Sequence, residues 1–342
     1  MKVELLDIRY SRAVDRYVLA HPQGTPFHET RWLDLVNSTA GFESRTLVAW
    51  AGREIRGVLP LALVAAPITG RRLVSVPFGV YGGILASDSE AIGALDEAAR
   101  IIARNTHVRY IETRYLGPTV TGRPAESNYE SYRKELPESP DDVLGMIPRK
   151  ARAEVRKARN KHGLQFVEGE SLFDEFYELY CLNKRSLGSP VFRKGHFRRL
   201  MALYGNRAFL HGVAGGGDLL AAVLSLGSGS VIYPYYSGAV PGAGRLGVNN
   251  AMYASLMEDS VLKGYRIFDF GRSRKNSGPA AFKQHMGFEP TPLEYEFYFP
   301  SGGRASAITP SNPKMAIPQR VLSRLPMWAA RLVGPALMRH VP

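Results

Sequence analysis

The fold of this chain is decided by the stretch from Val231 to Phe299, which reads VIYPYYSGAVPGAGRLGVNNAMYASLMEDSVLKGYRIFDFGRSRKNSGPAAFKQHMGFEPTPLEYEFYF. Its aromatic and β-branched start predicts a strand over 231–236, and its apolar spacing predicts a helix over 248–262. The rest predicts a strand over 266–270, a polar loop from Phe270 to Lys275, a short helix over 280–286 and a strand over 293–299. This order of elements is typical of an α/β fold.

The first half of the chain shows a similar order of elements. An aromatic and glycine-rich break over 78–83, a predicted helix over 89–104 and a predicted strand over 108–114 precede their counterparts at a nearly constant offset. A duplicated domain explains this order, and chance similarity between two α/β segments is the alternative. We therefore expect two tandem domains and a tail, with bounds 1–138, 139–300 and 301–342.

The composition is that of a globular protein, with 45% hydrophobic and 22% charged residues. No run approaches the ~18 apolar residues that a membrane span needs. The first residues are charged and contain no apolar core of a secretory signal. Cys181 is the single cysteine, which excludes an internal disulfide and fits a reducing compartment. The sequence thus predicts a cytoplasmic protein.

The chain is strongly basic, with a net charge of +13 and a pI of about 9.8. Such a surface favours partners that carry phosphate or carboxylate groups, and the alternative is that the arginines merely cover solvated faces. The densest basic run is 149–161, which we expect to form a helix. Its Arg152, Arg156 and Lys157 are predicted to hold an anionic donor or acceptor.

The tail over 301–342 combines several prolines with apolar residues and cations. One interpretation is a basic amphipathic segment that contacts the inner face of a membrane. The other is an arm that packs back on the domain, and the sequence slightly favours this one.

The residues Gly242-Ala243-Gly244-Arg245-Leu246-Gly247 match the G-x-G-x-x-G pattern of dinucleotide-binding proteins. Ala239, Val240 and Pro241 intervene before the first glycine, which should follow the strand almost directly, and that strand is expected in an antiparallel set. The pattern therefore indicates a turn that presents backbone N–H groups at the start of the next helix, where a phosphate or carboxylate could bind.

Other kinds of site are not supported by the sequence. The eight histidines show no metal-ligand spacing, so no metal is predicted. Neither a G-x-S-x-G nor a Walker motif occurs. Cys181 lies in an amphipathic helix and is predicted to be part of the core.

The strands, glycine-rich turn and helix of the second half resemble the acetyltransferase (GNAT-like) fold, although the usual coenzyme A signature is absent from the turn. The ordered motifs resemble those of the FemABX family, the aminoacyltransferases of peptidoglycan interpeptide bridges. The resemblance is closest to FemAB-related proteins of exosortase and exopolysaccharide systems and covers about residues 1–300. The motifs that carry it are Gly247-x-Asn249-Asn250, Gly264-Tyr265-x-x-Phe268-Asp269-Phe270-Gly271, Phe282-Lys283-x-x-x-Gly287-Phe288, the basic segment 153–163, and the segments His21–Trp32 and Pro77–Gly83.

The resemblance implies two tandem GNAT-like domains of α/β (α+β) class, with mixed, mainly antiparallel sheets flanked by helices. It places the catalytic lysine of the family on Lys283, which would stabilise the donor carbonyl as an oxyanion forms. The alternative for Lys283 is a solvated helix lysine. The other residues expected in the site are Tyr235, Tyr236 and Asp269 for catalysis, and Tyr81, Asn249, Arg272, Arg274, Lys275 and Phe282, with the basic helix, for substrate binding.

The sequence thus predicts an acyl- or aminoacyltransferase that acts on an amine or hydroxyl of a cell-envelope or exopolysaccharide precursor, without a covalent enzyme intermediate. No tightly bound cofactor and no DNA are expected; the donor would be aminoacyl-tRNA or acyl-CoA. The alternative is a degenerate, non-catalytic transferase that binds an anionic glycan or RNA. The long coiled-coil arm of the staphylococcal family members is missing, and they have no counterpart of the tail.

Overall fold

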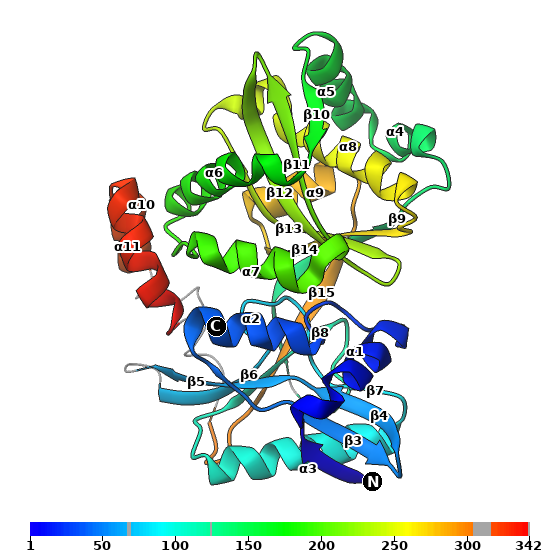
Figure 1. The fold of residues 1–342 in the computed structure, drawn as a ribbon, viewed down its shortest axis with the longest axis vertical. Coiled ribbons are helices and arrows are strands. Elements are labelled where there is room, and N and C mark those ends of the chain that lie inside the picture. The colour runs from blue at the N-terminus through cyan, green and yellow to red at the C-terminus, as the bar shows by residue number, and fades with distance from the viewer. Residues whose placement is uncertain (67–69, 124, 304–315, 341–342) are drawn as a thin grey trace. The chain divides into compact units, whose positions relative to one another are not determined.

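The structure is a computed structural model that describes residues 1–66, 70–123, 125–303 and 316–340 (Figure 1). The chain forms two compact units. Unit 1 comprises 1–129, 292–316 and 333–342, and unit 2 comprises 130–291 and 317–332. Each unit is assembled from several segments of the chain, so the predicted domain bounds stay a prediction.

Unit 1 contains, in its described part, two groups of strands, three complete α-helices and the second half of α11 (Met327–Met338). Its elements are β1 (Lys2–Leu5), α1 (Ser11–Ala20), α2 (Thr30–Ala40), β2 (Glu43–Ser44), β3 (Leu47–Ala51), β4 (Glu54–Leu59), β5 (Leu61–Ala66), β6 (Gly70–Ser75), β7 (Leu85–Ala86), α3 (Ser89–Asn105) and β8 (Ile111–Leu116), with most of β15 (Pro290–Tyr298). One sheet has the order β1-β3-β4-β7, and the other strands follow the order β15-β8-β6-β5-β2. All the described pairings except the parallel β6–β8 pair are antiparallel.

Unit 2 has its strands in the order β10-β11-β12-β13-β14-β9. The elements are β9 (Ala125–Glu135, whose second half belongs here), α4 (Val143–Met146), α5 (Arg149–Asn160), β10 (Gln165–Glu168), α6 (Phe173–Ser186), α7 (Lys194–Tyr204), β11 (Ala208–Gly215), β12 (Asp218–Ser228), β13 (Val231–Ala239), α8 (Val248–Leu262), β14 (Ile267–Arg274) and α9 (Gly278–His285), followed by α10 (Ala316–Arg324) and the first half of α11 (Met327–Met338). The β10–β13 pairings are antiparallel, and β13 pairs with β14 in parallel. The predicted α/β class with mixed, mainly antiparallel sheets is confirmed.

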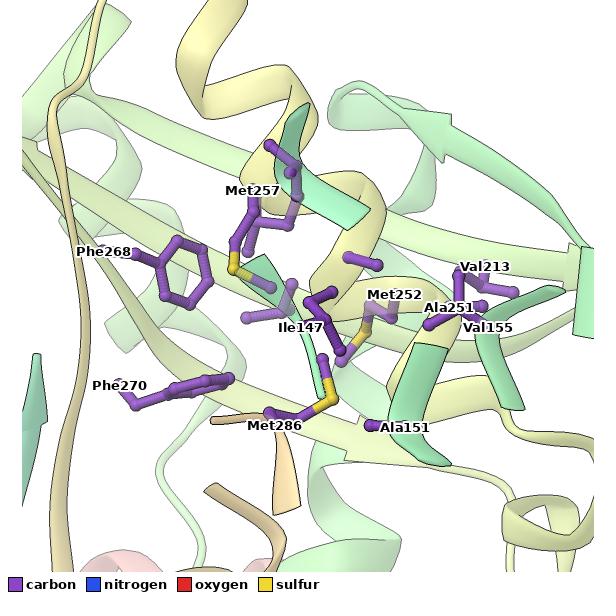
Figure 2. Packing of buried hydrophobic residues seen from close by; sticks show 14 of the residues in the cluster. Ile147, Ala151, Val155, Val213, Ala251, Met252, Met257, Phe268, Phe270 and Met286 are labelled. Carbon is purple, nitrogen blue, oxygen red and sulfur yellow. The ribbon is translucent and has the colours of Figure 1, made fainter. Parts of the chain in front are cut away.

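The core of unit 2 is built around α8. Nine of its fifteen residues are buried, on all sides of the helix, as expected of a helix enclosed by other elements. Figure 2 shows Met252 and Met257 of α8 gathered with Ile147, Phe268 and Met286. Helix α8 therefore packs with both β13, which precedes it, and β14, which follows it, in one core.

Helix α5 packs against α8 through small residues and turns its charges outward. Ala151, Val155 and Ala158 recur at helical spacing and are fully buried. Gly247 lies just before α8, and a Cβ there would come within 3.1 Å of the carbonyl oxygen of Glu154. The close packing leaves Arg156 and Lys157 exposed on the opposite face of α5.

Helix α6 lies directly against β13 because Gly238 has no side chain. A Cβ on Gly238 would lie 2.3 Å from the carbonyl carbon and oxygen of Leu179, which are backbone atoms that cannot move aside. The side chain of Asn183 donates to the carbonyl of Ser237 at 2.9 Å beside this contact. The position of α6 over the strand thus depends on one glycine.

We predict that Gly238→Ala lowers the free energy of unfolding by about 2 kcal/mol, because an overpacked site has to displace backbone. Urea denaturation measures the change. Gly195→Ala in α7 is the matched control, since its Cβ would meet no atom within 4 Å; it should leave stability unchanged or raise it slightly. Equal stability of the two variants would contradict the close approach of α6 and β13.

Candidate functional site

Strand β13 contains a bulge where it faces the predicted site. Leu224 pairs with Tyr236 and Ser225 pairs with Pro234, so β13 has one residue more than β12 at this point, Tyr235. Pro234 has no N–H to donate to a neighbouring strand, and bulges are one of the few places where strands accept proline. The bulge turns the end of β13 and re-aims its tyrosines.

The pairing of β13 with β14 is short. It joins Val231 to Ile267 and Ile232 to Phe268, and both strands continue beyond these pairs. Because Pro234 and the bulge follow at once, the two parallel strands separate toward their carboxyl ends. Ligands of open α/β sheets bind at such carboxyl ends, where neighbouring strands diverge.

Asp269 lies on β14 just past the last pair and is 1% exposed. Its Oδ1 accepts from the amide of Gly271 at 2.7 Å and lies 3.5 Å from the Ser131 hydroxyl. Its Oδ2 lies 3.6 Å from the Arg133 guanidinium. These contacts hold the backbone at Gly271, whose φ of 64° favours glycine. In this structure Asp269 organises the strand end.

Lys283 is the centre of the arrangement. It lies in α9, is 8% exposed, and its ammonium donates to the carbonyl oxygens of Phe270, Gly271 and Arg272 at 2.8, 2.9 and 3.2 Å. Only the charged form of lysine has three N–H groups for three acceptors. The ammonium also lies 5.4 Å from the ring centroid of Tyr132. The alternative of a solvated helix lysine is therefore wrong.

Burial lowers the pKa of Lys283 to about 7, while the Asp269 carboxylate raises it and the Arg272 guanidinium lowers it further. The helix that carries Lys283 starts at a defined place, since the Ser277 hydroxyl accepts from the amide of Ala280 at 3.4 Å. The result is a cation held inside the protein at the point where two strands part.

The two predicted tyrosines differ in surroundings. Tyr236 is 6% exposed and packs among the rings of Tyr180, Phe192 and Phe197, with its hydroxyl 3.2 Å from His196 Nε2. Burial raises the pKa of Tyr236 well above its usual value and lowers that of His196 to about 3. Tyr236 is thus a neutral, packed phenol. Tyr235, the bulge residue, is only half-buried and stacks edge-on against it.

Arg272, Arg274 and Lys275 are all exposed. The prediction that they share a loop is wrong for the two arginines, because β14 extends to Arg274. Strand alternation places both arginines on one face and the buried Ser273 on the other. Just before these residues, the Asp269 carboxylate accepts a hydrogen bond from the amide of Gly271.

The remaining predicted residues are more dispersed. Phe282 is half-buried, with its ring near those of Tyr253 and Phe270. Asn249 is half-buried in the first turn of α8. Arg152 is half-buried and donates to the Leu144 carbonyl at 3.4 Å. Tyr81 belongs to unit 1, where it is buried beside Phe27.

One residue near the site was not predicted. Lys184 lies at the end of α6, half-buried, with its ammonium 5.7 Å from the ring centroid of Tyr180. Burial, followed by the nearby Arg272 guanidinium, lowers its pKa to about 8. Within the described part of the chain it has no carboxylate partner. A lysine at the end of an amphipathic helix is normally solvated, so the sequence gave no indication that Lys184 is half-buried.

Two other motifs have structural explanations. The turn Gly242–Gly247 follows a strand that pairs antiparallel with β12, unlike the strand of a dinucleotide fingerprint. Glu168, His211 and Asp259 lie close enough to hold a metal ion. The Lys263 ammonium, however, already pairs with both carboxylates, at 2.9 Å from Glu168. The absence of a metal stays a prediction.

Comparison with known proteins agrees with this geometry. Residues 148–284 match the model of the acetyltransferase (GNAT) domain family. The chain carries a GNAT domain. This domain contains α5, the bulged strand, α8, the separated strand ends and Lys283. The predicted acyltransferase class is thereby confirmed at the level of the domain. No curated protein matches the chain.

Solved structures place the GNAT domain within a larger similar fold. A crystal structure of FemX is similar over 86% of this chain and 97% of its own, with 16% identity and a TM-score of 0.66. A tandem GNAT protein from the clavulanic acid biosynthesis pathway is similar over 89% of this chain and 99% of its own, with 13% identity and a TM-score of 0.53. The C-terminal domain of a putative lysylphosphatidylglycerol synthetase from Agrobacterium fabrum is similar over 96% of this chain and 97% of its own, with 13% identity and a TM-score of 0.56. The expected FemABX-like, tandem GNAT-like fold is confirmed.

The buried lysine predicts a specific dependence of stability on pH. The folded protein releases the Lys283 proton near pH 7, whereas the unfolded chain keeps it until about its ordinary pKa of 10.5. Between these values the unfolded state binds more protons, so the free energy of unfolding should rise with pH. The expected rise is on the order of a few kcal/mol, since one pKa unit corresponds to about 1.4 kcal/mol.

Urea denaturation of the wild type and of Lys283→Met at pH 6, 7, 8 and 9 measures the part of this pH dependence that comes from Lys283. The wild type should gain stability relative to the variant as the pH rises. Parallel pH profiles for the two proteins would show that Lys283 has an ordinary pKa.

Proposed function

We propose that the chain transfers an acyl or aminoacyl group to an amine, or to a hydroxyl, of a cell-envelope or exopolysaccharide precursor, directly from donor to acceptor. The observation that carries the proposal is the buried Lys283 ammonium at the separated ends of β13 and β14. A fixed cation in a low-dielectric site stabilises developing negative charge far better than one in water.

In the proposed step, the acceptor amine attacks the carbonyl carbon of an ester or thioester donor. A C–N bond forms, the carbonyl oxygen becomes an oxyanion, and the C–O or C–S bond then breaks. The amine proton ends on the leaving alcohol or thiol. Lys283 would redirect one N–H to the oxyanion, and its longest hydrogen bond, to the Arg272 carbonyl at 3.2 Å, is the one it would exchange.

A direct transfer needs no nucleophile from the protein, and the surroundings of the candidate groups support this. Cys181 is fully buried and burial raises the pKa of its thiol, which makes it a poor nucleophile. Asp269 is occupied with the strand end, and Tyr236 stays neutral and packed. An α-amino acceptor, with an ordinary pKa of about 7.7–8.0, is partly neutral at pH 7 without a base.

The donor in this proposal is aminoacyl-tRNA or acyl-CoA, both of which carry phosphates. Arg156 and Lys157 on the outer face of α5, the turn before α8, and Arg272 and Arg274 are the groups that would receive them. The similar folds of FemX and of the lysylphosphatidylglycerol synthetase domain favour an envelope precursor as acceptor. Tyr81 and Asn249 remain proposed substrate contacts.

Replacing Lys283 tests the site. We expect Lys283→Ala to lower kcat for transfer by roughly 10²–10³, the usual effect of removing one oxyanion donor, and Lys283→Arg to retain part of the activity. Product formation is followed by mass spectrometry with the true donor and acceptor. The exposed Lys2→Ala in unit 1 serves as control. Unchanged transfer by Lys283→Ala would remove Lys283 from the mechanism.

The basic face of α5 should bind the donor and take no part in the chemistry. Arg156→Ala/Lys157→Ala is expected to raise the KM for the donor about tenfold with little change in kcat, as loss of roughly 1.4 kcal/mol of binding requires. Arg12→Ala/Arg16→Ala, two exposed arginines on α1, is the control. An unchanged KM in the α5 variant would place the donor elsewhere.

A non-catalytic protein that binds an anionic glycan or RNA is the competing function, and the basic face of α5 favours it equally. A thermal-shift screen with acyl-CoAs, UDP-muropeptides and tRNA, combined with product detection, separates the two. Stabilisation by tRNA alone, steeply weakened by salt and without any product, would support binding only.

A further inference from the structure

The tail presents large apolar side chains to solvent. Val321, Trp328 and Leu332 are 56%, 72% and 71% exposed. Trp328 and Leu332 are four residues apart in α11 and therefore adjacent on one helix face. Isolated exposed apolar residues are ordinary, but an exposed tryptophan beside an exposed leucine on a short terminal helix indicates a contact surface.

This face is exposed even though α11 is held in place. Arg331 pairs with Glu178 of α6 and lies 5.5 Å from the ring centroid of Tyr177. Ala330 is buried. Helix α11 thus packs on unit 2 through Ala330 and Arg331, as the arm interpretation of the tail expected, while Trp328 and Leu332 stay exposed. The exposed pair is a feature of a docked helix, which Figure 1 shows beside α6.

The charge of the same segment has a single sign. Residues 301–342 contain the cations Arg304, Lys314, Arg320, Arg324, Arg331 and Arg339, and neither aspartate nor glutamate. Arg320 and Arg324 are exposed, one turn apart in α10, on either side of Val321 in the sequence. A segment that exposes apolar residues and arginines, and that contains no carboxylate of its own, is complementary to a surface that is apolar inside and anionic outside.

We propose that α10 and α11 dock on the surface of a bilayer that contains anionic lipids, with Trp328 and Leu332 inserted at the level of the headgroups and Arg320 and Arg324 on the lipid phosphates. Tryptophan is favoured at this depth, because its ring is apolar and its N–H is polar. Cations near an anionic leaflet add attraction that salt screens. No helix of the described residues is long and apolar enough to cross a membrane, so the proposed contact is peripheral.

Vesicle flotation of the full chain tests the proposal. Vesicles of phosphatidylcholine with phosphatidylglycerol are compared with pure phosphatidylcholine at low and high salt. We expect at least tenfold more protein on the anionic vesicles at low salt, and less at high salt. The fluorescence of the exposed Trp328 should shift to the blue on binding, above the background from Trp32 and Trp50. Equal partition to both vesicles, or none, would overturn the proposal.

The variant Trp328→Ala/Leu332→Ala should lose most of the partition. Leu187→Ala/Leu262→Ala is the matched control, because it removes two leucines of comparable exposure, 56% and 72%, outside the tail; it should float as the wild type does. Gel filtration tests the alternative that a second copy of the chain binds to the face formed by Trp328 and Leu332. A dimer that only the Trp328→Ala/Leu332→Ala variant abolishes, together with unchanged flotation, would also overturn the proposal.

Discussion

The site of this protein depends on one interaction, the triple hydrogen bond from the Lys283 ammonium to the carbonyls of Phe270, Gly271 and Arg272. A buried cation is costly unless backbone or side-chain groups solvate it. The three carbonyls belong to β14 residues that lie beyond its last pair with β13. The bulge at Tyr235, the short β13–β14 register and the Asp269–Gly271 hydrogen bond together shape this strand end.

The residues that were predicted together as one site differ in burial and in their contacts. Asp269 is buried and holds the backbone at Gly271, whereas Tyr236 is buried in an aromatic cluster and contacts His196. Tyr235, Arg272 and Arg274 are the members that solvent, and therefore a substrate, can reach. In the proposed transfer, Asp269 holds the strand end whose carbonyls bind the Lys283 ammonium, while the accessible residues contact the donor and the acceptor. This separation resembles the general design in which rigid elements support a small number of reactive groups.

Much of the fold could be predicted from local patterns. The helix over 248–262 and the neighbouring strands follow from apolar spacing and glycine punctuation, and Pro234 within a strand is a signal of the bulge. The burial of Lys283 could not be predicted in this way, because it depends on backbone carbonyls that converge only in three dimensions. The strand character of Arg272 and Arg274 was missed because a run of polar and charged residues after a glycine also fits a loop. Lys184 was missed because a helix-end lysine shows no sign of the ring and guanidinium beside it.

The claim that the Lys283 amino group is desolvated at the strand ends is tested most directly by NMR. The protein is labelled with ¹³C in its lysine side chains, and Lys283→Met identifies the Lys283 Cε signal in a titration from pH 5 to 11. The structure predicts that this signal titrates near pH 7, far below the signals of the exposed lysines, because the site is desolvated. A Lys283 signal that titrates near 10.5 with the solvated lysines would contradict the account.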